Sequence, residues 1–176
     1  MGKLKIGTRG SNLALWQAQY LATQIKLHTD TQVEIIIIKT KGDKILDVAL
    51  SKIGDKGLFT KEIEIKLLEK EIDIAVHSMK DLPSVLTDGL MIGAVLKRED
   101  PRDVFISQDN LAIGDLPLGA KIGTSSLRRI AQVKAFRPDI VTVDIRGNVE
   151  TRIRKMREED LDGIILAYAG VKRLNL

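Results

Sequence analysis

The sequence predicts an α/β protein of two domains, each built on a mostly parallel sheet. Short β-branched runs alternate with helical segments along the chain of 176 residues, and no internal repeat is visible. The charged, proline-containing stretch "KREDPRD" (97–103) interrupts this alternation, which then starts again. We therefore expect a first domain over residues 1–98, a hinge over 99–103 and a second domain over 104–176.

The first domain is expected to begin with a strand and a capped helix. "KLKIGT" (3–8) has a strand pattern, and Ser11 is a favourable N-cap for a helix whose apolar face is formed by Ala14, Ala18, Leu21, Ala22 and Ile25. The β-branched run "VEIIIIK" (33–39) predicts a strand buried on both faces. The Gly- and Lys-rich stretch 39–57 predicts a mobile segment.

The later elements follow the same alternation. The first domain continues with a helix over 60–70 and two strands, "IDIAVHS" (72–78) and "LMIGAVL" (90–96). In the second domain we expect four strands, "DVFIS" (103–107), "AKIGT" (120–124), "DIVTVDI" (139–145) and "DGIILAY" (162–168). Two helices lie between them, "SSLRRIAQVKAF" (125–136), ended by Pro138, and "NVETRIRKMREE" (148–159), with Asn148 as N-cap. The last residues, "AGVKRLNL" (169–176), resemble the start of another helix, so we expect a fragment.

Composition excludes several classes of protein and site. No apolar run approaches the ~20 residues of a membrane span, and "MGKLKIGTRG" contains no apolar signal segment, which predicts a cytoplasmic protein without a membrane partner. The chain has no cysteine, so it contains no disulfide, thiolate metal site or cysteine nucleophile. No histidine or carboxylate spacing suggests a metal site.

Basic charge is concentrated in the last third of the chain. Residues 121–176 contain 12 Lys and Arg against 7 Asp and Glu, and 8 of the 11 arginines lie there. A nucleic-acid partner is one interpretation. However, aromatic residues make up only 3% of the chain, and none alternates with the arginines as a base-stacking surface requires. A compact anionic ligand is favoured, because the guanidinium fork matches carboxylates.

Polar clusters follow several predicted strands. They are Arg9 and Ser11 in "IGTRGS", Ser78, Lys80 and Asp81 in "AVHSMKDLPS", Thr124, Ser125, Ser126, Arg128 and Arg129 in "IGTSSLRR", and Arg146 and Arg152 in "DIRGNVETR". Ligands bind outside the carboxyl ends of strands in open α/β sheets, and helix N-termini there attract anions. Each residue also has a purely structural explanation: Ser11 as an N-cap, His77 as a packed strand-end histidine, the arginines as solvated helix residues. The joint placement on successive strand ends predicts an anion site.

Several longer blocks carry a resemblance to a known family. "GTRGSNLALWQAQ", "DKGLFTKEIE", "DIAVHSMKDLP", "REDPRDVFIS", "KIGTSSLRRIAQ", "DIRGNVETRIRK" and "GIILAYAGVKRL" together resemble the hydroxymethylbilane synthase (porphobilinogen deaminase) family, from residue 7 to the end of the chain. The resemblance implies a transferase of porphyrin and haem biosynthesis. Such an enzyme joins four porphobilinogen units into hydroxymethylbilane and releases ammonia at each addition. It also implies two periplasmic-binding-protein-like domains and a third, α+β domain.

The resemblance also implies roles for individual residues. Asp81 corresponds to the catalytic carboxylate of the family, and Lys56 and Phe59 lie on its active-site loop. Each pyrrole carries an acetate and a propionate, so the growing chain is a polyanion. The expected carboxylate-binding residues are Arg9, Ser11, Ser78, Lys80, Thr124, Ser125, Ser126, Arg128, Arg129, Arg146, Arg152 and Arg173. Arg128 and Arg129 are expected to diverge, one guanidinium to each of two neighbouring carboxylates.

The chain departs from the family pattern at the cofactor. Family members attach a dipyrromethane cofactor to a cysteine of the third domain, and this chain has neither that cysteine nor that domain. We therefore expect a truncated chain, inactive alone, with the first domain lacking its return segment. The resemblance implies porphobilinogen as the partner, a monomeric complete enzyme and no nucleic acid. A non-catalytic, two-lobed anion-binding module remains an alternative, because both would use arginine-rich sites.

Overall fold

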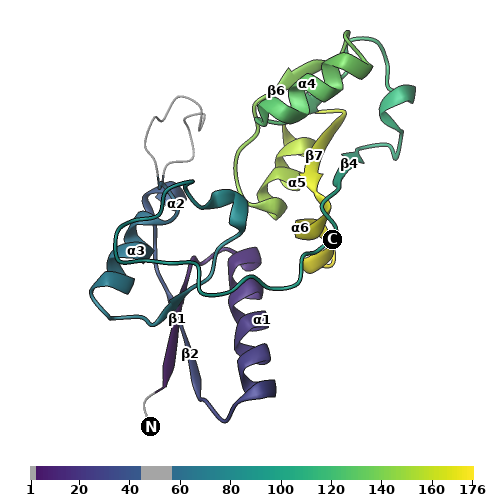
Figure 1. The fold of residues 1–176 in the computed structure, drawn as a ribbon. Helices are drawn as coiled ribbons and strands as arrows, with labels where there is room; N and C mark the ends of the chain where they lie inside the picture. The colour runs from purple at the N-terminus through teal and green to yellow at the C-terminus, as the bar shows by residue number, and fades with distance from the viewer. Residues whose placement is uncertain (1–2, 45–56) are drawn as a thin grey trace. The chain divides into compact units, whose positions relative to one another are not determined.

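The computed structural model describes residues 3–44 and 57–176, which form two compact units (Figure 1). Among these residues, the first unit comprises 3–44 and 57–97, and the second comprises 98–176. The predicted hinge, 99–103, lies in the second unit, and the predicted domain boundaries stay a prediction. Both units contain a sheet with helices against it and most strand pairs are parallel, so the predicted α/β class is confirmed.

The first unit is built on a parallel sheet with the strand order β2-β1-β3. The strands are β1 (Leu4–Thr8), β2 (Val33–Ile37) and β3 (Ile74–Ala75). Helix α1 (Asn12–His28) covers one face of the sheet and forms a first apolar cluster with it. Helix α3 (Lys61–Leu68) belongs to a second apolar cluster. Ile6, Ala18 and Ala22 are the buried centre of the first cluster. The short helices α2 (Lys41–Lys44) and η2 (Met79–Asp81) lie in the connections.

One burial prediction and one strand prediction for this unit are wrong. Residues 33–39 were expected to be buried on both faces, but β2 is an edge strand of the described sheet, and Ile37 is 56% exposed. Residues 90–96 form no strand, because no described strand pairs with them; Met91 and Val95 are exposed. An apolar run becomes a strand only when a neighbour accepts its backbone hydrogen bonds, and sequence periodicity does not identify that neighbour.

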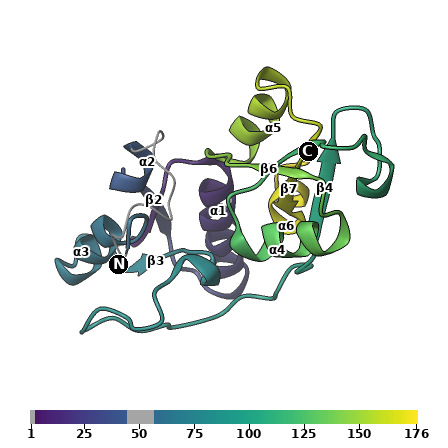
Figure 2. The same ribbon diagram turned by 90° about the horizontal axis from the view of Figure 1, so that it is seen from above.

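The second unit has a four-stranded sheet with the order β4-β7-β5-β6. Strands β5 (Lys121–Gly123), β6 (Val141–Val143) and β7 (Gly163–Ala167) are parallel, whereas β4 (Asp103–Ser107) is antiparallel to β7. Figures 1 and 2 show α4 (Leu127–Phe136) and α5 (Val149–Glu158) on opposite faces of this sheet. The unit also contains η3 (Ile113–Asp115) and α6 (Tyr168–Arg173).

Alternation along β7 divides the core of the second unit into two clusters. Ile165 packs with Ile122, Val133 and Ile140 on the α4 face, whereas its neighbours Ile164 and Leu166 belong to the cluster that contains residues of α5 and α6.

None of the helices that the structure describes is long and apolar enough to cross a membrane. The described residues, 3–44 and 57–176, contain no cluster of three or more His, Cys, Asp or Glu side chains able to hold a metal ion.

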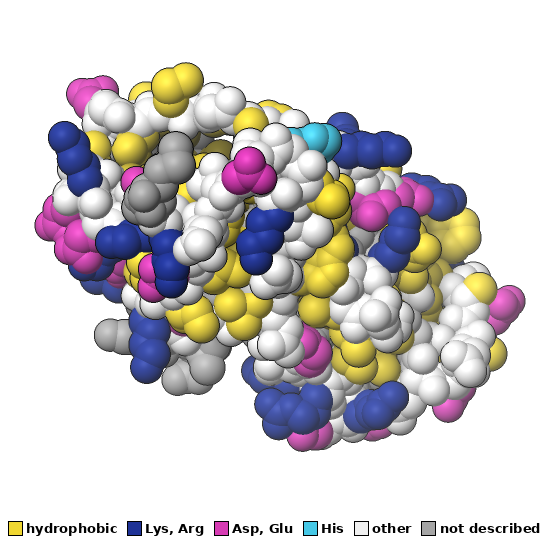
Figure 3. Space-filling model, turned by 90° about the horizontal axis from the view of Figure 1, so that it is seen from below, with side chains coloured by type: hydrophobic (Ala, Val, Ile, Leu, Met, Phe, Trp, Pro, Cys, Tyr) yellow, Lys and Arg dark blue, Asp and Glu magenta, His cyan; other side chains and the backbone are white. Residues whose placement is uncertain are grey.

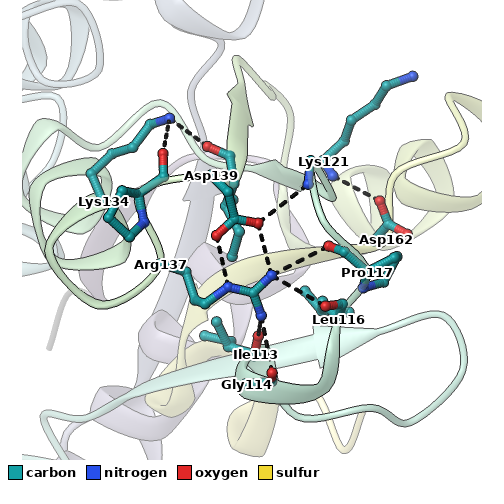
Figure 4. Close-up of polar contacts among 12 residues, drawn as sticks. Ile113, Gly114, Leu116, Pro117, Lys121, Lys134, Arg137, Asp139 and Asp162 are labelled. Atoms are coloured by element: carbon teal, nitrogen blue, oxygen red, sulfur yellow. Dashed lines mark hydrogen bonds and ion pairs between the residues drawn. The ribbon is translucent and has the colours of Figure 1, made fainter.

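Arg137 joins the loop around η3 to the end of α4 (Figure 4). Its guanidinium donates to both carboxylate oxygens of Asp139 at 2.8 Å and to the carbonyls of Ile113, Gly114 and Leu116 at 3.0–3.2 Å. Asp139 also accepts from the amide of Gly119 at 3.2 Å. The hydrogen bond from Arg137, more than any other interaction, holds the pKa of Asp139 below its ordinary value. One guanidinium is therefore the shared donor to Asp139 and to three carbonyls of the η3 segment.

Arg137→Ala is expected to lower the melting temperature by several degrees, because it leaves these carbonyls and Asp139 without their shared donor. Thermal unfolding at pH 7 measures the effect. Arg154→Ala, which removes the mostly exposed pair with Glu158 on α5, is the control and should change little. The folded-state pKa of Asp139 is depressed, so its contribution is present above the ordinary pKa and is lost as the pH falls through the folded value. The difference between wild type and Arg137→Ala should therefore shrink in acid.

Candidate functional site

The loop between β5 and α4 carries three hydroxyl side chains at the start of a helix. Thr124 is buried, and its Oγ1 accepts a hydrogen bond from the amide of Ser126 at 3.3 Å. Ser126 occupies the N-cap position of α4 without a side-chain capping bond. Free amides and the positive end of the helix dipole therefore lie beside a hydroxyl group, an arrangement that favours an anion.

Ser125 connects this loop to the loop after β6. Its Oγ donates to the carbonyl of Ile145 and accepts from the amide of the same residue, both at 3.1 Å. Ile145 directly precedes Arg146, so this pair of hydrogen bonds fixes the backbone from which the Arg146 side chain extends. The sequence suggested a ligand contact for Ser125. That contact stays a prediction; in the structure the hydroxyl joins the two loops, a role that depends on β5 and β6 being neighbours.

Arg128 and Arg129 meet on one internal carboxylate. Arg128 Nη2 lies 2.7 Å from Oδ2 of Asp103, and Arg129 Nη2 lies 2.7 Å from Oδ1 of the same side chain. Arg129 also donates to the carbonyl of Ile165 at 2.9 Å. Without a ligand the two guanidiniums therefore converge on one protein carboxylate, and their divergence to two ligand carboxylates stays a prediction. Burial raises the pKa of Asp103, but the hydrogen bonds from Arg129 and Arg128 outweigh it and hold the pKa below its ordinary value.

The loop between β6 and α5 contributes two more arginines. Asn148 caps α5 by accepting from the amide of Thr151 at 2.8 Å, as predicted. Gly147 has φ +121°, and a Cβ there would lie 2.5 Å from the Thr151 side chain, so glycine is required at this sharp turn. Arg152 Nε donates to the Gly147 carbonyl at 2.9 Å, which folds the side chain back toward the loop that begins at Arg146.

The electrostatics of Arg152 depend on two other arginines. The pKa of Arg152 is lowered, first by burial and then by the positive charges of Arg129 and Arg146. Among the described residues, Nε of Arg129 is buried without a hydrogen-bond partner. A bound anion would relieve both the mutual repulsion and the missing hydrogen bond. Arg173 is the last residue of α6 and is half-buried.

In the first unit, Arg9 follows β1 and contacts both Asp43 and Phe59. Its Nε lies 3.0 Å from Oδ1 of Asp43, and its Nη2 forms an ion pair with the same oxygen. The guanidinium lies 4.2 Å from the centroid of the Phe59 ring, a cation–π contact. A Cβ at Gly42 would meet that ring at 2.3 Å, so a glycine is needed for the close packing. Phe59, expected on the active-site loop, thus lies against a predicted binding arginine.

Asp43 is in turn held by Thr40. The Thr40 hydroxyl and amide donate to Oδ2 of Asp43 at 2.8 and 3.1 Å, and Thr40 is completely buried. Burial raises the pKa of Asp43, but the bonds from Arg9 and Thr40 outweigh it and keep the pKa below its ordinary value. The carboxylate is therefore ionised near neutral pH, and it orients Arg9.

The serines of the first unit have structural partners. Ser11 caps α1 by accepting from the amide of Ala14 at 3.4 Å, which confirms the predicted N-cap. Ser78 accepts from Nε2 of Gln17 at 3.1 Å, which connects α1 to the segment after β3. Neither contact excludes a second hydrogen bond, because a hydroxyl can both donate and accept.

Lys80 and Asp81 are exposed on η2, directly after β3. The turn is closed by the Asp81 amide, which donates to the Ser78 carbonyl at 2.9 Å. His77 lies beside them: burial lowers its pKa most, the charges of Asp81 and Glu64 raise it, and Arg9 lowers it further. The net pKa is below the ordinary value, so the ring is neutral at pH 7. His77 is thus close enough to both Arg9 and Asp81 to sense their charges.

Sequence reasoning missed two residues that organise these loops, Asp43 and Asp103. Asp43 stood in a stretch interpreted as mobile, and Asp103 in one interpreted as a hinge. Each contacts arginines 25 to 34 residues away along the chain, and no local spacing signals such a pairing.

Lys56, predicted on the active-site loop, lies outside the described residues. Figure 3 shows acidic and basic side chains interspersed over the face it draws.

Comparisons with known proteins agree on one family. A family model described as "Porphobilinogen deaminase, dipyromethane cofactor binding domain" matches residues 4–176. The chain is 71% identical over its whole length to the porphobilinogen deaminase of Syntrophomonas wolfei, and covers 58% of that protein. It is 63% identical over 96% of its length to that of Carboxydothermus hydrogenoformans, covering 55% of it. The chain thus spans little more than half the length of these curated relatives.

Proposed function

Since this chain belongs to the porphobilinogen deaminase family, we propose that it is part of a hydroxymethylbilane synthase, a transferase of porphyrin and haem biosynthesis. Such an enzyme condenses four porphobilinogen molecules into the linear tetrapyrrole hydroxymethylbilane, with loss of ammonia. One observation carries the proposal: among the described residues, the buried Nε of Arg129 has no hydrogen-bond partner, and the charges of Arg129 and Arg146 add to burial in lowering the pKa of Arg152. A cluster of this kind suits a ligand with several carboxylates.

The proposed catalytic residue is Asp81. In the deamination, the aminomethyl C–N bond breaks with its electron pair on nitrogen, which takes up a proton and leaves as ammonia. The remaining methylene-pyrrole is cationic, and a nearby carboxylate stabilises it. A carbon of the acceptor pyrrole then forms the new C–C bond and loses its proton, which a carboxylate can accept. Asp81 suits this role because it is exposed on a turn whose backbone is hydrogen-bonded.

The proposed carboxylate-binding residues fall into two groups. Arg128, Arg129, Arg146 and Arg152 supply charge in the second unit, and Arg9 and Lys80 supply it in the first. Arg173 also belongs to the proposed set. The remaining members are hydroxyl donors at the strand ends, namely Ser11, Ser78, Thr124, Ser125 and Ser126. For Ser125 the contribution we propose is indirect, because its hydroxyl already bonds both backbone groups of Ile145.

The same arginines fit the dipyrromethane cofactor of the family. It carries acetate and propionate groups, which suit the buried Nε of Arg129, an atom with no partner among the described residues, and the charges of Arg146 and Arg152. When bound, dipyrromethane supplies the primer pyrrole on which the chain is extended. The sequence contains no cysteine, so these residues would contribute non-covalent contacts only. We further propose a monomeric enzyme of the cytoplasm with domain boundaries near residues 98 and 104.

The test is turnover of porphobilinogen by the full-length natural protein. We expect one ammonia released for each porphobilinogen consumed and a linear tetrapyrrole as product, detected by mass spectrometry. Binding of porphobilinogen without ammonia release would instead support the non-catalytic anion-binding module. Neither binding nor turnover would refute both.

A further inference from the structure

One carboxylate lies between two adjacent arginines of different exposure. Arg129 is 11% exposed and is held from two sides, by Oδ1 of Asp103 and by the carbonyl of Ile165. Arg128 is 59% exposed, and its described hydrogen bond goes to Oδ2 of Asp103. Asp103 itself is 21% exposed at the start of β4. Its two oxygens thus join a largely buried guanidinium to a solvent-exposed one.

This geometry places a protein carboxylate where a ligand carboxylate would bind. Both inter-residue distances are 2.7 Å, typical of charge-assisted hydrogen bonds. An incoming carboxylate that uses the same Nη groups must therefore replace Asp103 or share them with it. Apparent affinity then depends on the competition between the two carboxylates, not on the arginines alone.

We propose that Asp103 is a resident counter-ion of Arg128 and Arg129, a positioning residue that orients the pair and competes with ligand carboxylates for it. The inference rests on the proposed function of this site in binding a carboxylated ligand. Asp103 keeps two like charges close together in the free protein and limits how tightly an anion is held. Weak holding is useful for a ligand that must shift as it grows.

The consequence is an increase in affinity when Asp103 loses its charge. Asp103→Asn keeps the size of the side chain but removes the competing anion, so Arg128 and Arg129 are left with uncompensated charge. A structural lesion would do the opposite, because disordered arginines bind anions less well. The direction of the change therefore separates a competing counter-ion from a residue needed only for folding.

The experiment measures citrate binding to the full-length protein by isothermal titration calorimetry at low salt. We expect Asp103→Asn to bind citrate at least threefold more tightly than wild type, and Asp103→Glu to remain within about twofold of it. Asp100→Asn is the matched control: it removes another Asp–Arg pair, with Arg102, from the same segment and should leave citrate affinity unchanged. In an Arg128→Ala background the effect of Asp103→Asn should shrink, since the two residues act through one contact.

Unchanged or weaker citrate binding by a folded Asp103→Asn protein would overturn the inference. If that variant does not fold, wild type provides the test: carbon-13 NMR of the Asp103 carboxyl should show a higher pKa with saturating citrate than without it. A pKa that citrate does not move would refute the exchange. Wild-type turnover of porphobilinogen tests the proposed function separately, because the citrate comparison does not depend on turnover.

Discussion

Asp81→Asn in the full-length natural protein is expected to slow porphobilinogen turnover by about 100-fold or more while leaving the fold intact. The substitution preserves the shape of the side chain but removes the negative charge that would stabilise the cationic methylene-pyrrole. Asp81 is exposed, and the turn that carries it is closed by backbone hydrogen bonds, so the melting temperature should not change. Steady-state ammonia release at saturating porphobilinogen measures the chemical step.

Two further variants make this test specific. Asp81→Glu keeps the charge but displaces it, so it should retain a fraction of the wild-type rate. Asp88→Asn, at another exposed aspartate of the same connecting segment, should behave as wild type. Substrate binding by Asp81→Asn should survive, because the proposed binding charges are arginines. A wild-type rate for Asp81→Asn would move the catalytic role to another residue.

Arg129→Ala is expected to have the second-largest effect, on both stability and activity. The substitution removes the ion pair with Asp103 and the hydrogen bond to the Ile165 carbonyl. The Arg129 side chain that makes both contacts is only 11% exposed. Breaking a largely buried pair from one side costs about 2–5 kcal/mol of unfolding free energy. Urea denaturation of the full-length protein measures the loss, and turnover should fall in parallel because a proposed carboxylate ligand is gone.

The neighbouring arginine is the control for this prediction. Arg128→Ala removes a 59% exposed partner of the same carboxylate and should cost only about 0–1 kcal/mol in stability. Arg129→Lys keeps the charge but loses the planar fork, so it cannot reach Asp103 and Ile165 together and should be intermediate. Equal stability losses for Arg128→Ala and Arg129→Ala would show that burial does not distinguish the two.

Local chemistry was sufficient to predict several elements from the sequence. Ser11 and Asn148 are N-caps because each accepts a hydrogen bond from an amide three residues ahead, an interaction that depends only on neighbouring residues. The alternation of strands and helices likewise predicted the α/β class, since periodicity is a property of short segments. The family blocks allowed the catalytic and binding residues to be proposed by position.

Contacts between distant segments were decided by the tertiary structure alone. Arg128 and Arg129 follow β5, yet they converge on Asp103, because β4 is antiparallel to β7 and its first residue therefore lies at the carboxyl ends of β7 and β5. Arg9 is aimed by Asp43 and packed on Phe59 only after three separate segments fold together. Strand order and edge positions have no signature in local periodicity, which reports what a residue faces but not which residue it meets. The sequence thus determined most of the elements and the number of arginines available, whereas the partners of these arginines depended on the order and direction of the strands.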